Sequence, residues 1–422
     1  MEATRIRLAE GVHLTYLPAR KFKTSLLSAQ FVTPLRRETA GANALLAAVL
    51  RRGTVSCPDM GALSAKMDNL YDASIDYTVR KKGENQCVGF VASFIDDRYA
   101  PGGERLLEPA AALLGELICD PVTYHGRFVP EYFESEKTNL LEAIRSLIND
   151  KRDWADSRLL RALCDGEAYA VPRLGDEETV DKLQALKVYT QYRDLISTAP
   201  LEIIYSGSAD LERVKQALAA AFATLPREEV RVISKAAPHV CRESVQYVED
   251  VLDVTQGKLG MGFSCGSDDM PALLMGNTLF GGSSNSKLFL NVREKLSLCY
   301  YASSLYHRQK GLITVSSGIE FQNYQRAYDE IMAQLEAVQK GELEDWELEG
   351  ARSTLLNSYA TVGDSQGKLE NFYLGQAATG QHETPADLAR AIQDMTAERI
   401  CRAMSTVKLD TVYFLKGKEA EA

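Results

Sequence analysis

The sequence contains few histidines, and none of them lies close to another. The five are His13, His125, His239, His307 and His382, so no two of them can share a helix face. A local pair of histidine ligands for a metal is therefore excluded. The eight cysteines form no Cys-x-x-Cys pair, so neither a zinc knuckle nor a redox motif is indicated.

A hydrophobic run long enough to cross a membrane is also missing. The N-terminal segment lacks the apolar core of a signal peptide, so we expect a cytoplasmic protein that does not bind a membrane. Positive charge is in deficit, because 48 lysines and arginines stand against 58 aspartates and glutamates, for a formal net charge of −10. This balance disfavours nucleic acid as a partner. No phosphate-binding loop and no Gly-x-Ser-x-Gly nucleophile elbow occurs.

The composition that is present, 45% hydrophobic and 25% charged, is that of a globular protein. At 422 residues the chain is too long for one ordinary core, so two or more domains are expected. Both halves show the same order of patterns: strands, helices, one long hairpin, a cluster of helices and a final strand. The hairpins are predicted at 74–93 and 300–319.

A local match supports an internal repeat. The segment "LYDASIDYTVRKKG" in the first half resembles "CYYASSLYHRQKG" in the second, and Gly53 and Tyr71 are as far apart as Gly282 and Tyr300. A repeat of this length indicates a duplicated domain. We predict an α+β fold made of two similar tandem domains, each a mostly antiparallel sheet covered by helices on one face.

The predicted domain boundaries follow from a polar, proline-bearing stretch between the halves. Residues 226–243 show weak patterning and are interpreted as a linker. The prediction is therefore an N-terminal domain over 1–225 and a C-terminal domain over 244–422.

The stretch "LFGGSSNSKLFLNVREKLSLCYYASS", residues 279–304, resembles the second-domain signature of the pitrilysin/insulinase-like zinc metallopeptidases, which include mitochondrial processing peptidase. Lys287 stands where that signature has arginine, and Ser297 where it has glycine. The residues at the signature positions, with Lys287 as the lysine in place of arginine, are Gly281, Gly282, Ser284, Lys287, Leu288, Phe289, Arg293, Glu294, Lys295, Leu298 and Tyr300.

The resemblance implies that Arg293 and Tyr300 contact a peptide substrate. A guanidinium binds peptide carbonyls or a carboxylate through several donors, and a phenol donates to a carbonyl that gains negative charge. The residues taken alone allow another interpretation, in which Arg293 pairs with a nearby glutamate on an exposed helix face and Tyr300 packs at the start of a strand.

The family's zinc motif, His-x-x-Glu-His, is degenerate in the stretch "NALLAAVLRRGT". Alignment on Gly53 and Thr54 places Ala44 at the first histidine, Ala47 at the glutamate and Ala48 at the second histidine. A methyl group has no lone pair to donate to zinc, and without a carboxylate at position 47 no base activates a water.

The family's third zinc ligand is a glutamate on a later helix. Glu136 matches the first glutamate of that helix pattern, and Ala143 falls at the ligand position. Glu142 is adjacent, but it points about 100° away around a helix. A register shifted by one residue would make Glu142 the ligand, and one carboxylate alone does not hold a catalytic zinc.

These residues predict a non-catalytic, peptide-binding subunit of a heterodimeric zinc metallopeptidase that processes extended peptides or leader segments. No cofactor is expected on this chain, and zinc is expected on a partner that keeps the intact motif. The alternative is a structural or peptide-binding homodimer of the same fold without a peptidase role. A self-sufficient zinc peptidase is disfavoured by the missing ligands.

Overall fold

The computed structural model describes residues 3–235 and 237–418. Contacts divide the chain into two compact units, and each unit takes a segment from the opposite half of the sequence. Unit 1 comprises Met1–Arg145, Val171–Lys235 and Gly363–His382. Unit 2 comprises Ser146–Ala170, Ala236–Val362 and Glu383–Ala422. The predicted domain boundaries, which ignore these exchanged segments, stay a prediction.

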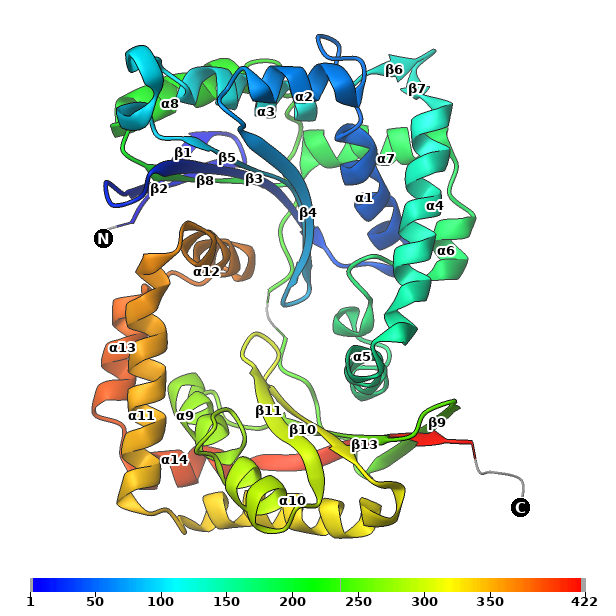
Figure 1. The fold of residues 1–422 in the computed structure, drawn as a ribbon, viewed down its shortest axis with the longest axis vertical. Helices are drawn as coiled ribbons and strands as arrows, with labels where there is room; N and C mark the ends of the chain where they lie inside the picture. The colour runs from blue at the N-terminus through cyan, green and yellow to red at the C-terminus, as the bar shows by residue number, and fades with distance from the viewer. Residues whose placement is uncertain (1–2, 236, 419–422) are drawn as a thin grey trace. The chain divides into compact units, whose positions relative to one another are not determined.

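Unit 1 is built on a six-stranded sheet in the order β1-β2-β8-β3-β5-β4 (Figure 1). All neighbours are antiparallel except β2 and β8, which are parallel. Because β4 pairs with β5 alone, it forms one edge of the sheet. The strands are β1 (Thr4–Ala9), β2 (Val12–Pro18), β3 (Thr24–Pro34), β4 (Ser74–Lys82), β5 (Asn85–Ile95) and β8 (Leu201–Gly207); β6 (Thr123–Tyr124) and β7 (Arg127–Phe128) pair separately.

Helices cover both faces of this sheet. On β3, Leu27, Ala29 and Phe31 alternate toward a large apolar core, which α1, α3 and α7 also enter. The other face meets α12, where the Ser28 hydroxyl donates to Glu370 at 2.7 Å. The helices are α1 (Arg37–Leu50), α2 (Met60–Asp68), α3 (Leu107–Cys119), α4 (Pro130–Ser146), α6 (Glu177–Asp181), α7 (Ala185–Thr198), α8 (Leu211–Ala221) and α12 (Gln366–Thr379).

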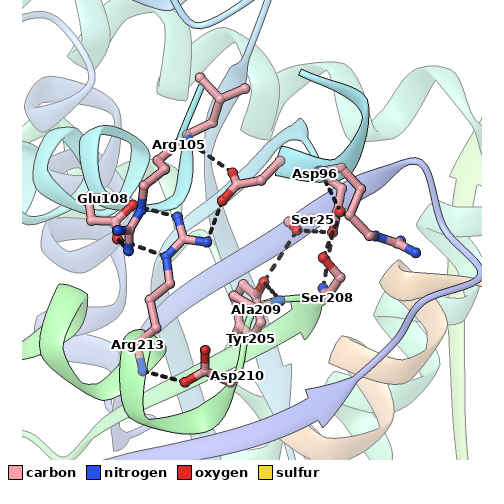
Figure 2. Close-up of polar contacts among 12 residues, drawn as sticks. Ser25, Asp96, Arg105, Glu108, Tyr205, Ser208, Ala209, Asp210 and Arg213 are labelled. Carbon is pink, nitrogen blue, oxygen red and sulfur yellow. Dashed lines mark hydrogen bonds and ion pairs between the residues drawn. The ribbon is translucent and has the colours of Figure 1, made fainter. Parts of the chain in front are cut away.

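A buried carboxylate joins the ends of three strands in unit 1 (Figure 2). Asp96 accepts hydrogen bonds from the hydroxyls of Ser25 at 3.0 Å and Ser208 at 2.7 Å, and from the Arg98 guanidinium at 2.8 Å. Burial alone would raise the pKa of Asp96, but the bonds from Ser208 and Arg98 outweigh it and hold that pKa below its ordinary value.

A second ion pair in Figure 2 links α3 to α8. Arg213 donates two parallel hydrogen bonds to the carboxylate of Glu108, at 2.8 and 2.7 Å, and also pairs with Asp97. The hydrogen bonding to Arg213 lowers the pKa of Glu108 to about 2. The two helices are thereby joined by a charge pair as well as by apolar contacts.

Unit 2 contains a five-stranded sheet in the order β11-β12-β10-β13-β9. Its strands are β9 (Gln246–Leu252), β10 (Gly257–Cys265), β11 (Cys299–His307), β12 (Leu312–Ile319) and β13 (Val407–Gly417). Its helices are α5 (Lys151–Leu163), α9 (Met270–Phe280), α10 (Tyr324–Lys340), α11 (Asp345–Ala360), α13 (Pro385–Gln393) and α14 (Ala397–Met404), with a π-helix over Leu288–Lys295.

Helix α5 reaches unit 2 from the first half of the sequence and packs on β10 and β13. Two glycines of β10 make room for it. A Cβ atom at Gly260 would lie 3.2 Å from the side chain of Leu159, and one at Gly262 would lie 2.7 Å from that of Leu163. Side chains at both β10 positions would therefore require Leu159 and Leu163 to shift.

The two sheets share one topology. The unit 1 order β2-β8-β3-β5-β4 corresponds to the unit 2 order β9-β13-β10-β12-β11, with the single parallel pair at the same place in each. The predicted α+β fold with a tandem duplication is confirmed. Among the described residues, no helix combines the length and the apolar character needed to cross a bilayer.

Candidate functional site

A cavity of about 1030 Å³ lies along the free edge of β4 in unit 1. We call it the edge cavity. Its walls come from α1, β4, α4, the segment before α6, and α12. Alternating β-branched residues of β4, such as Ile75 and Val79, point into the core and hold this strand in place.

Three of the four predicted degenerate positions meet in the edge cavity. Helix α1, rich in alanine and leucine, presents Ala44 and Ala48 one turn apart, and α4 supplies Ala143. Ala47 lies elsewhere: it is fully buried and borders an apolar space shared with Phe31 and Leu50. Position 47 therefore belongs to the core.

The carboxylate that remains near these alanines is already paired. Glu136 accepts from Arg52 at 3.0 Å and from the amide of Asn139 at 3.1 Å. The Arg52 guanidinium also lies 5.0 Å from the centre of the Tyr132 ring. Glu142, the neighbour of Ala143, is exposed.

The outer edge of β4 carries two arginines. Arg51 donates to the carbonyl of Ile75 at 2.5 Å, and Arg173 donates to the carbonyl of Val79 at 3.2 Å. Residues two apart on a strand direct their backbone groups to the same side, so Tyr77 faces that edge between the two. The Tyr77 side chain is 44% exposed.

The side of the edge cavity next to α12 is strongly polar. Arg80 makes a bidentate pair with the buried Glu370, at 2.6 and 2.7 Å. Lys82 donates to the side chain of Asn371 at 2.7 Å. Burial lowers the pKa of the Lys82 ammonium.

In unit 2 the structure brings Arg293 and Tyr300 to one pocket of about 450 Å³. The π-helix carries Arg293 and ends with a bond from the Leu296 N–H to the Asn291 carbonyl at 3.1 Å. Ser297 follows with a left-handed φ of 49° and turns the chain into β11, where Tyr300 lies. Such helices often occur at functional sites.

Both side chains of this pair contact glutamates. The Tyr300 hydroxyl donates to Glu320 at 2.5 Å, and this bond raises the pKa of the phenol. Arg293 lies 3.6 Å from Glu294 and 4.8 Å from the ring centre of Phe289. A carbonyl that accepts from Tyr300 would first have to replace Glu320.

Lys287, which stands at the family's arginine position, is buried. Its ammonium lies 3.0 Å from both oxygens of Glu347 on α11. The neighbouring glycine position is equally tight, because a Cβ atom at Gly281 would lie 2.7 Å from the backbone nitrogen of Ser304. The ion pair joins the start of the π-helix to α11, and the close approach at Gly281 sets the end of α9 against β11.

Comparison with known proteins identifies the family of this chain. The model of the peptidase M16 inactive domain matches residues 182–355. The chain is 34% identical over 416 residues to the probable inactive metalloprotease YmfF of Bacillus subtilis, covering 97% of this chain and 96% of that one. The chain belongs to the peptidase M16 family.

Solved structures show the same M16 fold. A conserved protein from Enterococcus faecalis superposes with a TM-score of 0.90 and 27% identity over the full length of both chains. A peptidase M16 inactive domain from Pseudomonas fluorescens superposes with a TM-score of 0.80 and 17% identity, also over both full chains. The likeness to these structures shows the fold of the chain.

The residues at this member's degenerate positions do not fit a catalytic zinc. The methyl groups of Ala44, Ala48 and Ala143 supply no donor atom. The carboxylates that line the edge cavity, Glu136 and Glu370, are each held by an arginine.

One group of described residues has spacing suited to a cation, and it lies in unit 2. Ligand atoms of Cys164, Glu167 and His239 come within 4.8 Å of one another. One ring nitrogen of His239 contacts Glu167, and the other lies 3.2 Å from Asp410. The contacts among these side chains satisfy both nitrogens without a metal.

Sequence reasoning did not identify Lys82 or Arg173 as site residues. Lys82 ends the basic run "RKK" at the turn of the predicted hairpin, and that run is the available signal. Arg173 lies in a stretch without periodic patterning, and Gln86 holds its carbonyl at 2.6 Å. Only the folded chain brings both to the edge cavity.

Proposed function

We propose that this chain is the non-catalytic, peptide-binding subunit of a heterodimeric zinc metallopeptidase. The observation that carries the proposal is the edge cavity, where the free edge of β4 lies beside alanines at the zinc-ligand positions. An open strand edge accepts an extended peptide by adding a strand. Alanine side chains leave room beside that edge but supply neither a metal ligand nor a general base.

The second support is the Arg293 and Tyr300 pair in unit 2. A chain that has lost its zinc ligands has no use for these side chains in its own hydrolysis. Both are nevertheless accessible and line one pocket. In the proposed complex they contact the peptide, while a partner chain with an intact His-x-x-Glu-His helix supplies zinc and the attacking water.

The isolated chain provides the first test. It is expected to retain less than stoichiometric zinc after dialysis and to leave unfolded peptides intact, while binding them measurably by calorimetry. Tightly held zinc at one atom per chain, together with hydrolysis by the chain alone, would contradict the proposal.

Reconstitution provides the second test. Hydrolysis should appear when a cognate chain with the intact zinc motif is added. Tyr300→Phe should then lower turnover roughly a hundredfold, the usual effect of losing one donor to a developing oxyanion, and Arg293→Ala should also reduce it. Tyr124→Phe and Lys295→Ala are matched controls on exposed residues outside the pocket. Full activity in both pocket variants would remove the proposed role of the pair.

Native mass spectrometry of the protein from its own cells separates the proposed heterodimer from the other assemblies. A complex with a zinc-bearing relative supports the proposal. A homodimer, or a larger assembly without peptidase activity, would instead indicate a binding or structural role.

A further inference from the structure

We propose that the edge cavity selects extended peptides that carry a carboxylate, and that Lys82 and Arg173 bind it. This inference rests on the proposed peptide-binding function and adds the chemical class of the peptide.

The first argument is the balance of charge around the edge cavity. Its lining contains the cations Arg80, Lys81, Lys82 and Arg173 and the carboxylates Glu136 and Glu370. Both carboxylates are occupied by arginines, Glu370 by Arg80 and Glu136 by Arg52 from outside the lining. Positive charge therefore predominates there, although the whole chain has a net charge of −10.

The second argument is that two of these cations form no ion pair with a carboxylate of the described residues. Within residues 3–235 and 237–418, neither Lys82 nor Arg173 lies within ion-pair distance of a carboxylate. Lys82 donates to Asn371, and Arg173 to the Val79 carbonyl. A half-buried ammonium whose hydrogen-bond acceptors are neutral has lost hydration without forming a direct ion pair, and the charge of nearby Glu370 offsets this only in part. The lowered pKa of Lys82 agrees with this state.

The third argument is the position of Arg173 on the strand edge. Its bond to the Val79 carbonyl, at 3.2 Å, occupies an acceptor that a peptide must use when it adds to β4. A peptide N–H that bonds this carbonyl displaces the guanidinium. A carboxylate on the same peptide then offers Arg173 a stronger partner, because charge-assisted hydrogen bonds exceed neutral ones.

Binding and selection are therefore coupled at β4. A neutral peptide has to remove Arg173 from Val79 and gives it no replacement. An acidic peptide exchanges the carbonyl for a carboxylate and also neutralises Lys82. The difference in binding affinity between the acidic and the neutral peptide measures this exchange.

The experiment uses the full-length chain and pairs of ten-residue Ser/Thr/Val peptides with a neutral fluorophore. The two peptides of a pair differ at one position, which is Glu in one peptide and Gln in the other. This position differs from pair to pair along the peptide. Fluorescence anisotropy should show roughly tenfold tighter binding of the best Glu peptide than of its Gln partner at low salt. The preference should shrink as salt increases.

Two variants assign the preference to residues. Lys82→Gln should weaken the binding of the Glu peptide and leave the binding of the Gln peptide unchanged. Arg173→Ala should abolish most of the preference for the Glu peptide. It should leave the Gln peptide bound equally well or better, because the Val79 carbonyl is then free of Arg173. Lys215→Gln, on α8 and paired with Glu212, is the control for removing one positive charge from unit 1.

The outcomes separate this inference from the proposed function. Equal binding of Glu and Gln peptides would overturn the charge selection and leave peptide binding intact. A preference that survives in both variants would overturn the assignment to Lys82 and Arg173. Absence of binding by every peptide would overturn the proposed function itself.

Discussion

Ser297 shows what a single departure from the family signature costs. Its φ of 49° lies in the left-handed region, which an L-residue with a Cβ occupies at a cost of about 1–3 kcal/mol. Glycine, the residue in the family signature, has no such penalty. The backbone geometry needed to bring Tyr300 beside Arg293 therefore explains the glycine of the signature.

We expect Ser297→Gly to stabilise the protein by about 1 kcal/mol, because relief of strain exceeds the added entropy of the unfolded chain. Urea unfolding monitored by circular dichroism measures the change. Ser303→Gly, within β11, is the matched control and should be neutral or destabilising. A destabilised Ser297→Gly variant would contradict the left-handed assignment.

Glu108 predicts a dependence of stability on pH. Its pKa of about 2 in the folded protein lies below the ordinary value near 4.5, so the unfolded chain takes up the proton first. The stabilisation by Arg213 is complete above the unfolded pKa and is lost as the pH falls from about 4.5 toward 2.

Urea unfolding between pH 7 and pH 3 tests this dependence. Glu108→Gln should be less stable than the parent at pH 7, and the two proteins should approach each other at pH 3. Glu131→Gln, at the start of α4 and without a described ion pair, is the control. A constant difference between Glu108→Gln and the parent across this range would contradict the proposed ionisation.

The link between the π-helix and α11 depends on one buried ion pair, Lys287 with Glu347. Lys287→Met should destabilise the protein by roughly 3–5 kcal/mol, because it leaves the buried carboxylate without a counter-charge. Lys295→Met, in the same π-helix but exposed, should change stability by less than about 0.5 kcal/mol.

Adding Glu347→Gln to Lys287→Met should recover part of the loss, because the neutral amide needs no counter-charge. Thermal unfolding of the parent, the two single variants and the double variant gives the comparison. A double variant as unstable as the sum of the two single variants would show that the pair is not coupled.

Helix α1 allows a direct test of the degenerate site. Ala44→His and Ala48→His introduce side chains that face the edge cavity, so they should be tolerated. Ala47→Glu buries a carboxylate beside Phe31 and Leu50 and should cost roughly 3–5 kcal/mol. Chemical unfolding of the single variants measures this order, and a tolerated Ala47→Glu would show that position 47 has access to water.

Periodicity predicted the elements whose apolar faces are built from local sequence. Both long hairpins, the helix with the degenerate zinc positions and the final strand of each half appear where expected. The exchanged helices α5 and α12 were not predicted. Helix α12 meets its sheet through polar contacts such as Ser28 with Glu370, so it lacks a strong apolar stripe.

The residues of the candidate site also divide into those that a linear motif predicts and those that only the folded chain brings together. The resemblance identified Arg293, Tyr300 and the alanine positions because each falls in a linear motif. It did not identify Lys82 or Arg173, whose meeting depends on the turn of the hairpin and on a loop from another part of unit 1. Charge selection in a cavity follows from three-dimensional neighbours, which a linear motif does not contain.

Because helices α5 and α12 are exchanged between the two halves of the sequence, we expect each half to depend on the other for its stability. Residues 1–235 lack α12, which leaves Arg80 without Glu370, and residues 236–422 lack α5, which leaves Gly260 and Gly262 uncovered. Each fragment expressed alone should be unstable or insoluble. Co-expressed, the two should purify together through a tag on one of them. Two independently stable, monomeric fragments would show instead that each half folds without the other's helix.

The apolar surroundings of Ala47 also bear on whether a hydrolytic site could be engineered into this chain. A carboxylate at position 47 would have to enter the core space that Ala47 shares with Phe31 and Leu50. Installing a catalytic base there therefore requires coordinated replacement of several core side chains, whereas positions 44 and 48 already face the edge cavity.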